Sequence, residues 1–257
     1  MKLLASDFDN TLYFNETPAF HPEDLAAIHR FQAAGNLFGI CTGRNLTAIT
    51  DATAGLIDFD FFILNNGSVI LDRTQKVCYQ EDIPTELAIK VMRHFDHLAS
   101  FAMVDQGIYQ YHFDHAWPGS GVRLIEDLHE IRESGVHNFS FHLDSVEETR
   151  RITNEINQLG LPITAFQNVI DIDVVAQGNS KGRALKLVQQ QYQIADSDLA
   201  CIGDSYNDLP MLTASDQSFT FNDSPASVRQ AATYTVASLA QAVAELLRQQ
   251  NDQAVGQ

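Results

Sequence analysis

Cysteine is scarce in this chain: only Cys41, Cys78 and Cys201 occur among 257 residues. Their number is odd, their spacing is wide and no C-x-x-C pair occurs, so we expect no disulfide framework. Sparse cysteine of this kind favours a reducing compartment, and we predict a cytoplasmic protein. Cys41 and Cys201 lie in apolar runs, which favours small buried side chains over reactive thiols.

Basic residues are also few, with 16 Lys and Arg against 33 Asp and Glu, for a net charge of −17. This balance argues against a nucleic-acid backbone or an anionic membrane surface as the main partner. No run of 18 apolar residues occurs, so no membrane span is predicted. The short apolar start is stopped by Asp7, well before a secretory signal would end. The 45% hydrophobic content is enough for one large or two modest domains.

Short apolar runs, each ending in polar or glycine-containing residues, recur along the chain. They are Leu3–Ser6, Leu37–Cys41, Phe61–Leu64 and Leu199–Ile202, with Phe219–Phe221 as a candidate fifth. The runs do not alternate, which is typical of strands buried on both faces of a parallel sheet. Helical spacing lies between some of them, over Pro22–Ala34, Ser180–Gln191 and Ser238–Arg248. We therefore predict an α/β sheet whose ligands bind at the carboxyl ends of the strands.

The middle of the chain follows a different pattern. Helices are predicted over Thr85–Ala99 and Val146–Leu159, and strands over Phe101–Val104, Ile108–Phe113, Asn138–Leu143, Pro162–Phe166 and Val169–Val175. Several of these strands alternate, which indicates an antiparallel sheet with one covered face. We interpret residues 80–179 as a second domain inserted into a core made of residues 1–79 and 180–257.

The first candidate site is "DFDNTL", residues 7–12, at the end of the first run. Residues i and i+2 of an extended chain point to the same side, so Asp7 and Asp9 would face one spot while Phe8 turns away. Two such carboxylates are costly together unless a cation or a proton relieves them, and hard oxygen ligands suit Mg²⁺. A turn or helix cap built by Asp and Asn explains this stretch alone equally well.

A second acidic strand end is "GDSYND", residues 203–208. Asp204 and Asp208 are four residues apart and would meet on the first turn of a following helix. Acids at a helix start are also ordinary capping residues. Two acidic strand ends in one sheet nevertheless favour a metal site, because they could hardly adjoin without a cation.

Two further stretches could bind an anion. One is "CTGR", with Thr42, Gly43 and Arg44 at a strand end. The other is "SKG", which places Lys181 at the start of a predicted helix. Hydroxyl, ammonium and free N–H groups together bind phosphate. Each stretch is weak alone, since a lysine such as Lys181 is more often a solvated surface residue.

The order of these stretches is more specific than any one of them. D-x-D-x-T, then T-G-R, then S-K-G after an inserted segment, then G-D-x-x-N-D resembles the haloacid dehalogenase superfamily. The pattern is most similar to the Cof-type branch, whose large cap lies between the second and third motifs, and "NSKGRAL" and Asn66-Gly67 also fit. The resemblance covers nearly the whole chain. It implies a Rossmann-like parallel-sheet core, an inserted α/β cap with a mainly antiparallel sheet, Mg²⁺, and hydrolysis of phosphomonoesters.

The resemblance also implies roles for the two acids of the first motif. Asp7 would be the nucleophile that forms an aspartyl-phosphate. Asp9 would protonate the leaving oxygen and then activate water, while its backbone carbonyl touches the metal. An acid at the second position favours hydrolysis over a stable phosphoenzyme.

The remaining implied roles concern phosphate and metal binding. Phosphate would be bound by Thr42, Gly43, Arg44 and Lys181, with Asn207 and Ser205 in support, and Mg²⁺ by Asp7, Asp9, Asp204 and Asp208. Asp208 would act directly, through water, or by orienting Lys181. The chain departs from the pattern at Asn10, where many relatives have glycine, and after the last motif, where Asn222 is a candidate for the family's active-site Asn.

The predicted cap is rich in histidine, with seven of the nine histidines between His94 and His142. Polar surface residues, substrate-selecting residues and a zinc site are the alternatives, and zinc would need converging ligands. Trp117 and Tyr111 are candidates for stacking on a substrate or for core packing.

A cleft under a cap suits a small phosphorylated metabolite, such as a sugar phosphate or a phosphorylated cofactor. We expect a monomer or homodimer. A phosphotransferase or phosphomutase on a sugar phosphate, and a non-catalytic sensor of phosphorylated ligands, are the competing functions. The intact acids and lysine argue against the sensor, because a binder needs no nucleophile.

Overall fold

A computed structural model describes residues 1–105, 107–119 and 121–255. An eight-stranded sheet, the core sheet, has the order β16-β15-β14-β1-β2-β3-β4-β5. Its strands are β1 Leu3–Ser6, β2 Leu37–Cys41, β3 Phe61–Leu64, β4 Val69–Asp72, β5 Val77–Gln80, β14 Leu199–Ile202, β15 Gln217–Phe221 and β16 Tyr234–Val236. The strands from β16 to β3 are parallel, and β4 and β5 add an antiparallel edge. This confirms the predicted parallel-sheet core.

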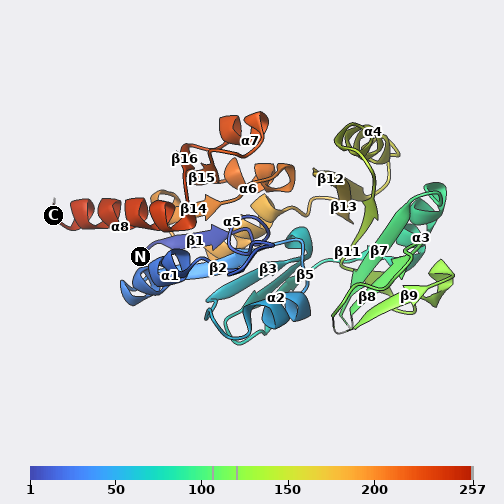
Figure 1. The fold of residues 1–257 in the computed structure, drawn as a ribbon, viewed down its shortest axis with the longest axis horizontal. Coiled ribbons are helices and arrows are strands. Elements are labelled where there is room, and N and C mark those ends of the chain that lie inside the picture. The colour runs from blue at the N-terminus through green and yellow to red at the C-terminus, as the bar shows by residue number, and fades with distance from the viewer. Residues whose placement is uncertain (106, 120, 256–257) are drawn as a thin grey trace.

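Helices cover both faces of the core sheet (Figure 1). They are α1 Pro22–Ala33, α2 Leu46–Thr53, α5 Lys181–Gln191, α6 Leu209–Leu212, α7 Ala226–Ala231 and α8 Leu239–Val255. Leu4 packs in one apolar cluster with α1, α2 and α8, whereas its neighbours Leu3 and Ala5 pack in another with α5, α6 and α7. Burial on both faces explains why these strands do not alternate.

A six-stranded sheet, the cap sheet, lies beside the core with the order β12-β13-β11-β7-β8-β9 (Figure 1). Its strands are β7 Ala99–Val104, β8 Gly107–Tyr111, β9 Val122–Ile125, β11 Asn138–His142, β12 Ile163–Asn168 and β13 Asp171–Ala176. Only the β8–β9 pair is parallel, which confirms a mainly antiparallel sheet. Helices α3 Thr85–His94 and α4 Val146–Asn157 pack on one face, and a short pair, β6 Ile83–Pro84 and β10 Gly135–Val136, lies beside them.

Polar contacts tie together the two chain crossings between core and cap. Asn179 Oδ1 accepts hydrogen bonds from the Tyr79 hydroxyl at 2.8 Å and from Arg183 at 2.7 Å. The Asn179 amide donates to the Glu81 carbonyl at 3.2 Å. The outgoing and returning chains are thus held side by side. The boundaries at residues 80 and 179 stay predictions.

The predicted element bounds need one main correction. The helix expected over Thr85–Ala99 ends at His94, and Ala99 already begins β7. Phe95 is 3% exposed and packs in the cap's apolar cluster, so burial of this ring rather than helical spacing accounts for the apolar residue there. The short strands β4, β5, β6, β9, β10 and β16 were not predicted from the sequence. Among the described residues, no helix has the length and apolar character needed to cross a membrane.

Candidate active site

Lys181 is the buried centre of the site. Its side chain is 1% exposed, and Nζ lies 2.7 Å from Asp7 Oδ1 and 2.6 Å from Asp208 Oδ1. Ser180 caps α5 by accepting a hydrogen bond from the Arg183 N–H, which places Lys181 at the first helical residue. The alternative of a solvated surface lysine is therefore wrong.

A glycine allows α5 to lie close to α6. A Cβ on Gly182 would lie 2.0 Å from the carbonyl oxygen of Pro210, so no larger residue fits without movement. This close packing joins the lysine-bearing helix start to the turn that carries Asp208. The small residue in "SKG" thus has a packing role beside the lysine.

Asp208 is completely buried and uses both carboxylate oxygens. Oδ1 accepts from Lys181, while Oδ2 accepts the N–H groups of Asp204 and Ser205, both at 3.0 Å. Asp204 in turn accepts a hydrogen bond from the Thr11 hydroxyl at 2.9 Å. Asp208 thus accepts hydrogen bonds from the backbone of the turn, as a capping residue does, and also pairs with Lys181. Thr11, the threonine of D-x-D-x-T, was given no role from the sequence.

Asp7, Asp204 and Asp208 each offer an oxygen within 4.8 Å of the others. Burial, with the charge of Asp208 added, raises the pKa of Asp7 well above its usual range and that of Asp204 to about 6. Burial opposes the charge on Lys181, but Asp208 and Asp7 outweigh it and raise the lysine pKa, so one ammonium faces three carboxylates. An all-oxygen set with excess negative charge fits Mg²⁺.

The side chains of Asp9 and Asp7 differ in exposure and in binding partner more than the sequence predicted. Its side chain is 49% exposed against 9% for Asp7, and both oxygens bind Arg44 at 2.6 and 2.9 Å. Both acids line the same cavity, and Phe8 is buried in the core as expected. The Asp9 carboxylate nevertheless lies outside the cluster of Asp7, Asp204 and Asp208, and it pairs with Arg44 instead. The predicted contact of its carbonyl with metal stays a prediction.

The predicted phosphate-binding residues gather around one cavity of about 160 Å³, which Thr42, Gly43, Arg44 and Asn207 line together with Asp7, Asp9 and Asp204. The Thr42 hydroxyl accepts the Arg44 N–H at 3.1 Å, so its own proton is free to be donated. Within the described residues, Asn207 Oδ1 is buried without a hydrogen-bond partner. Lys181 and Asp208 are buried in contact with Asp7 rather than in the cavity wall.

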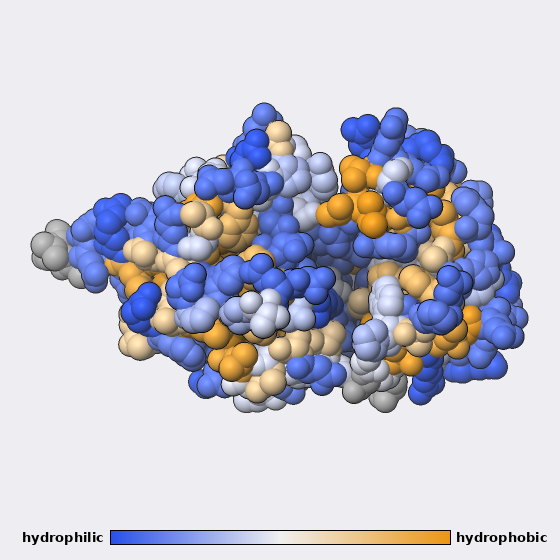
Figure 2. All heavy atoms as spheres, in the orientation of Figure 1, coloured by the Kyte–Doolittle hydropathy of each residue, from blue (hydrophilic) through white to orange (hydrophobic). Residues whose placement is uncertain are grey.

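The cap closes the other side of this cavity. The cap residues that line this cavity are Phe101, Met103, Asn168, Val169, Asp171 and Asp173. Figure 2 shows the molecule hollowed between core and cap. Asp173 accepts hydrogen bonds from Ser140 at 2.7 Å and Asn168 at 3.3 Å, and burial raises its pKa. Asp171 and Asp173 were given no role from the sequence, although the spacing in "DID", residues 171–173, puts both on one face of β13.

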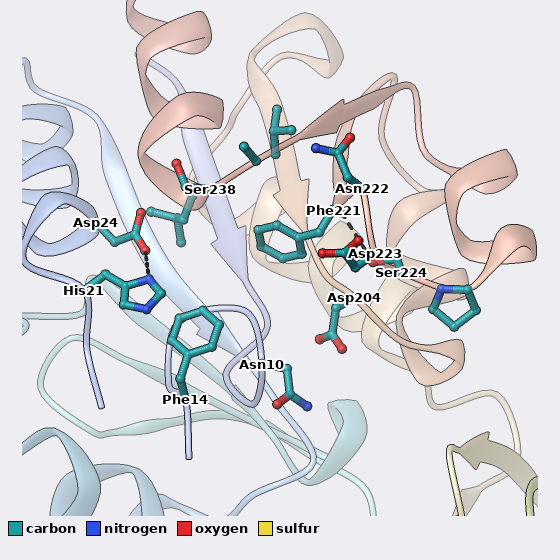
Figure 3. A pocket seen from close by; sticks show the side chains of 14 residues that line it. Asn10, Phe14, His21, Asp24, Asp204, Phe221, Asn222, Asp223, Ser224 and Ser238 are labelled. Carbon is teal, nitrogen blue, oxygen red and sulfur yellow. Dashed lines mark hydrogen bonds and ion pairs between the residues drawn. The ribbon is translucent and has the colours of Figure 1, made fainter. Parts of the chain in front are cut away.

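Asn222 lines a different cavity, of about 430 Å³, on which Asp204 also borders. Figure 3 shows Asp223 near Asp204, Asn222 farther from it, and Asn10 and Phe14 on the other side of the cavity. The proposed active-site role of Asn222 therefore finds no counterpart in the lining of the phosphate cavity. Asn10 has a φ of 57°, a left-handed conformation that Asn tolerates in place of glycine.

Two of the seven cap histidines, His137 and His142, bind carboxylates. His137 contacts Asp82 at 2.7 Å and Asp105 at 3.0 Å, and His142 contacts Asp171 at 2.7 Å. In the part of the chain that the structure describes, no histidine joins a group of three or more metal-ligating side chains. These contacts favour structural ion pairs over a zinc site.

The two aromatic candidates differ in their surroundings. Tyr111 packs beside the cap's apolar cluster and donates to Asp96 at 2.9 Å. Trp117 remains 38% exposed, beside Phe101 and Phe113. Trp117 lines a cavity together with a predicted site residue, Arg44.

Comparison with known proteins identifies the family. A family model described as haloacid dehalogenase-like hydrolase matches residues 4–247. The chain belongs to this family. The haloacid dehalogenase-like chain is 25% identical to a 5-amino-6-(5-phospho-D-ribitylamino)uracil phosphatase of Bacillus subtilis, over 93% of each chain.

Solved structures of the family share this fold. A haloacid dehalogenase-like hydrolase from B. subtilis superposes with a TM-score of 0.82 at 19% identity, covering 94% of this chain and 96% of the other. A subclass IIB sugar phosphatase gives 0.77 at 21% identity, covering 94% and 95%. The predicted superfamily, its Cof-type branch and the class of phosphoric monoester hydrolase are confirmed.

Proposed function

We propose that this hydrolase is a Mg²⁺-dependent phosphatase that cleaves small phosphomonoesters through an aspartyl-phosphate on Asp7. The observation that carries the proposal is the buried Lys181, held between Asp7 and Asp208 beside Asp204. Lys181 faces three acids, of which Asp7 and Asp204 line the phosphate cavity, and the excess negative charge would be balanced by a cation that enters with the phosphate. The cap of residues 80–179 then selects the substrate.

Asp7 attacks phosphorus with a carboxylate oxygen, and the ester P–O bond breaks as the new bond forms. Lys181 is already hydrogen-bonded to Asp7 at 2.7 Å, so the attacking group is fixed in direction before substrate arrives. The free proton of Thr42 and the N–H groups beside Gly43 supply donors to the phosphoryl oxygens. Asn207 supports the wall of the same cavity.

Asp9 carries the protons of both steps. It gives a proton to the leaving oxygen, then takes one from the water that attacks the phosphoryl group and frees Asp7 together with inorganic phosphate. Protonation requires that Arg44 first releases Asp9. A phosphate dianion in the cavity offers Arg44 an alternative partner, which makes substrate binding and release of Asp9 one event.

Mg²⁺ would be held by Asp7, Asp204 and Asp208, and it would supply charge neutralisation for the phosphoryl group. Burial and the charge of Asp208 raise the pKa of Asp7 and of Asp204, and a bound cation would favour the charged form of both carboxylates. Thr11 orients Asp204 from behind by its hydrogen bond at 2.9 Å.

The proposed substrate is a small phosphorylated metabolite. Support comes from a relative named for a phosphorylated ribitylaminouracil and from a structural neighbour named as a sugar phosphatase. The test is a screen of phosphorylated metabolites with purified protein and Mg²⁺, in which inorganic phosphate is measured. We expect release that needs no acceptor alcohol, stops with EDTA and returns with Mg²⁺. Release that depends on an acceptor, or that ignores EDTA, contradicts the proposal.

A further inference from the structure

A second cavity, of about 490 Å³, adjoins the phosphate cavity, and Arg44 and Met103 line both. We call it the side cavity. Its other lining residues are Asn45, Thr47, Ala48, Asp51, Ala52, Ile108, Trp117, Pro118, Gly119 and Val122. Its size lies within the range typical of small-ligand pockets, roughly 300–1,000 Å³. The two cavities thus share part of their walls, so the side cavity lies next to the place where a phosphate would bind.

The cap side of the side cavity is apolar. Met103 pairs with Ile108, and Ile108 with Val122, so these three side chains form a row across β7, β8 and β9. All three belong to, or pack against, one small apolar cluster with Phe101 and Phe113. A polyhydroxylated sugar here would face surface that cannot accept or donate hydrogen bonds.

Trp117 packs against two aromatic rings of the same apolar cluster and lines the side cavity. Its ring packs edge-to-face on Phe101, with centroids 4.8 Å apart, and on Phe113 at 5.2 Å. Its backbone N–H donates to Gln110 Oε1 at 2.8 Å. Yet 38% of the residue is exposed. A large ring that is held by its neighbours and still partly open is suited to stack on a ligand.

The charges around the two cavities disfavour a second anion. Asp51 lines the side cavity, and Asp171 and Asp173 line the cap side of the phosphate cavity. Among the described residues that line both cavities, Arg44 is the cation, and it pairs with Asp9 in the free protein and turns to the transferred phosphate in the proposed mechanism. A substrate with a second phosphate or a carboxylate would meet these acids without a free counter-charge, whereas a neutral or cationic group would not.

We infer that the side cavity binds the leaving group of the substrate and that this group is an uncharged or cationic aromatic ring. The inference rests on the proposed phosphatase function and narrows its substrate class. Aromatic contact of this kind adds to the free energy that is gained when apolar area is buried. We therefore expect about tenfold preference for an aromatic over a small alkyl leaving group.

Trp117 is the only tryptophan of the chain, so its emission reports on this cavity directly. The binding test titrates the protein, with Mg²⁺, with benzylphosphonate and with methylphosphonate, neither of which is hydrolysed. We expect benzylphosphonate to change the Trp117 emission with saturation and to bind about tenfold more tightly. Equal dissociation constants and unchanged emission with both probes would overturn the inference. Ring-dependent binding without phosphate release from benzyl phosphate would instead contradict the proposed function alone.

The kinetic test compares kcat/KM for benzyl phosphate with that for ethyl phosphate. Trp117→Ala should lower this ratio about tenfold, and Trp117→Phe should restore most of it. Tyr234→Ala is the matched control, because Tyr234 is also 38% exposed but lies on β16 at the far edge of the core sheet. A ratio that stays the same in Trp117→Ala, or that falls equally in the control, contradicts the inference.

Discussion

The side chains of the site differ in how far neighbouring residues determine their position. Asp7, Lys181, Asp204 and Asp208 converge at one edge of a parallel sheet. Asp7 follows β1, Asp204 comes two residues after β14, Asp208 directly precedes α6, and Lys181 begins α5. The sequence could predict that convergence. It could not predict that Asp9 binds Arg44, because both side chains are long enough to choose among several partners. That choice depends on the folded loops around them.

At this scale Lys181 is the first residue to test. Lys181→Met should lower the free energy of unfolding by about 3 kcal/mol without Mg²⁺, because it leaves Asp7 and Asp208 buried without a counter-charge. Mg²⁺ should restore part of the loss by neutralising the same carboxylates. The measurement is urea unfolding with and without the cation.

Lys186→Met serves as the control, since Lys186 lies in the same helix but its ion pair with Asp196 is exposed. Its effect should stay within about 1 kcal/mol. Equal losses of unfolding free energy in the two variants would show that the buried contacts of Lys181 with Asp7 and Asp208 stabilise the protein no more than an exposed ion pair does.

Metal binding is the second test among residues. Mg²⁺ should raise the midpoint of thermal unfolding of the unaltered protein, because a ligand of the folded state stabilises it. Asp204→Asn should reduce that shift strongly, while its amide oxygen can still accept from Thr11. Asp196→Asn, at an exposed acid, should keep the full shift. An undiminished shift in Asp204→Asn would remove this residue from the metal site.

Among the elements, the strands of the core were the easiest to predict. β1, β2, β3 and β14 have the predicted bounds because helices bury both of their faces, so their sequences are uniformly apolar. The ends of α3 and the short strands were harder. Their bounds depend on which neighbouring strand offers hydrogen bonds, and that information is not local.

The contact between α5 and α6 gives a prediction at the scale of elements. Gly182→Ala should destabilise the protein by about 1–3 kcal/mol, because its methyl group would collide with the Pro210 carbonyl. It should also lower turnover, since the collision displaces Lys181 from Asp208. Gln190→Ala, at an exposed position of the same helix, should change neither by much. Unfolding and phosphate release measure the two effects, and an unaltered Gly182→Ala protein would contradict this packing.

At the scale of the whole molecule, the cap brings a layer of side chains over a site that the core already builds. Phe101, Met103 and Asp173 reach the phosphate cavity only because the cap sheet faces the core. Alternation along each strand could have assigned them to one face. Which face meets the core is decided by how the two parts dock, and the sequence pattern does not contain that.

Asp173, a buried carboxylate on the cap side of the phosphate cavity, should make the stability of the protein depend on pH. Its raised pKa means that the folded state binds this proton more tightly than the unfolded chain does. Its contribution to stability is therefore greatest below the ordinary carboxyl pKa and declines as pH rises through the raised value. Asp173→Asn removes this decline, so the variant should gain stability relative to the unaltered protein between pH 4 and pH 7. An identical stability difference at both pH values in urea unfolding would contradict this account.

The central claim is that Asp7 forms a bond to phosphorus, and one comparison tests it most directly. Phosphate release from benzyl phosphate with Mg²⁺ is measured for the unaltered protein and for Asp7→Asn, after thermal unfolding has shown that both are folded. The account predicts a loss of about a thousandfold or more in Asp7→Asn, because the amide cannot act as the nucleophile. Full turnover in a folded Asp7→Asn protein would contradict it.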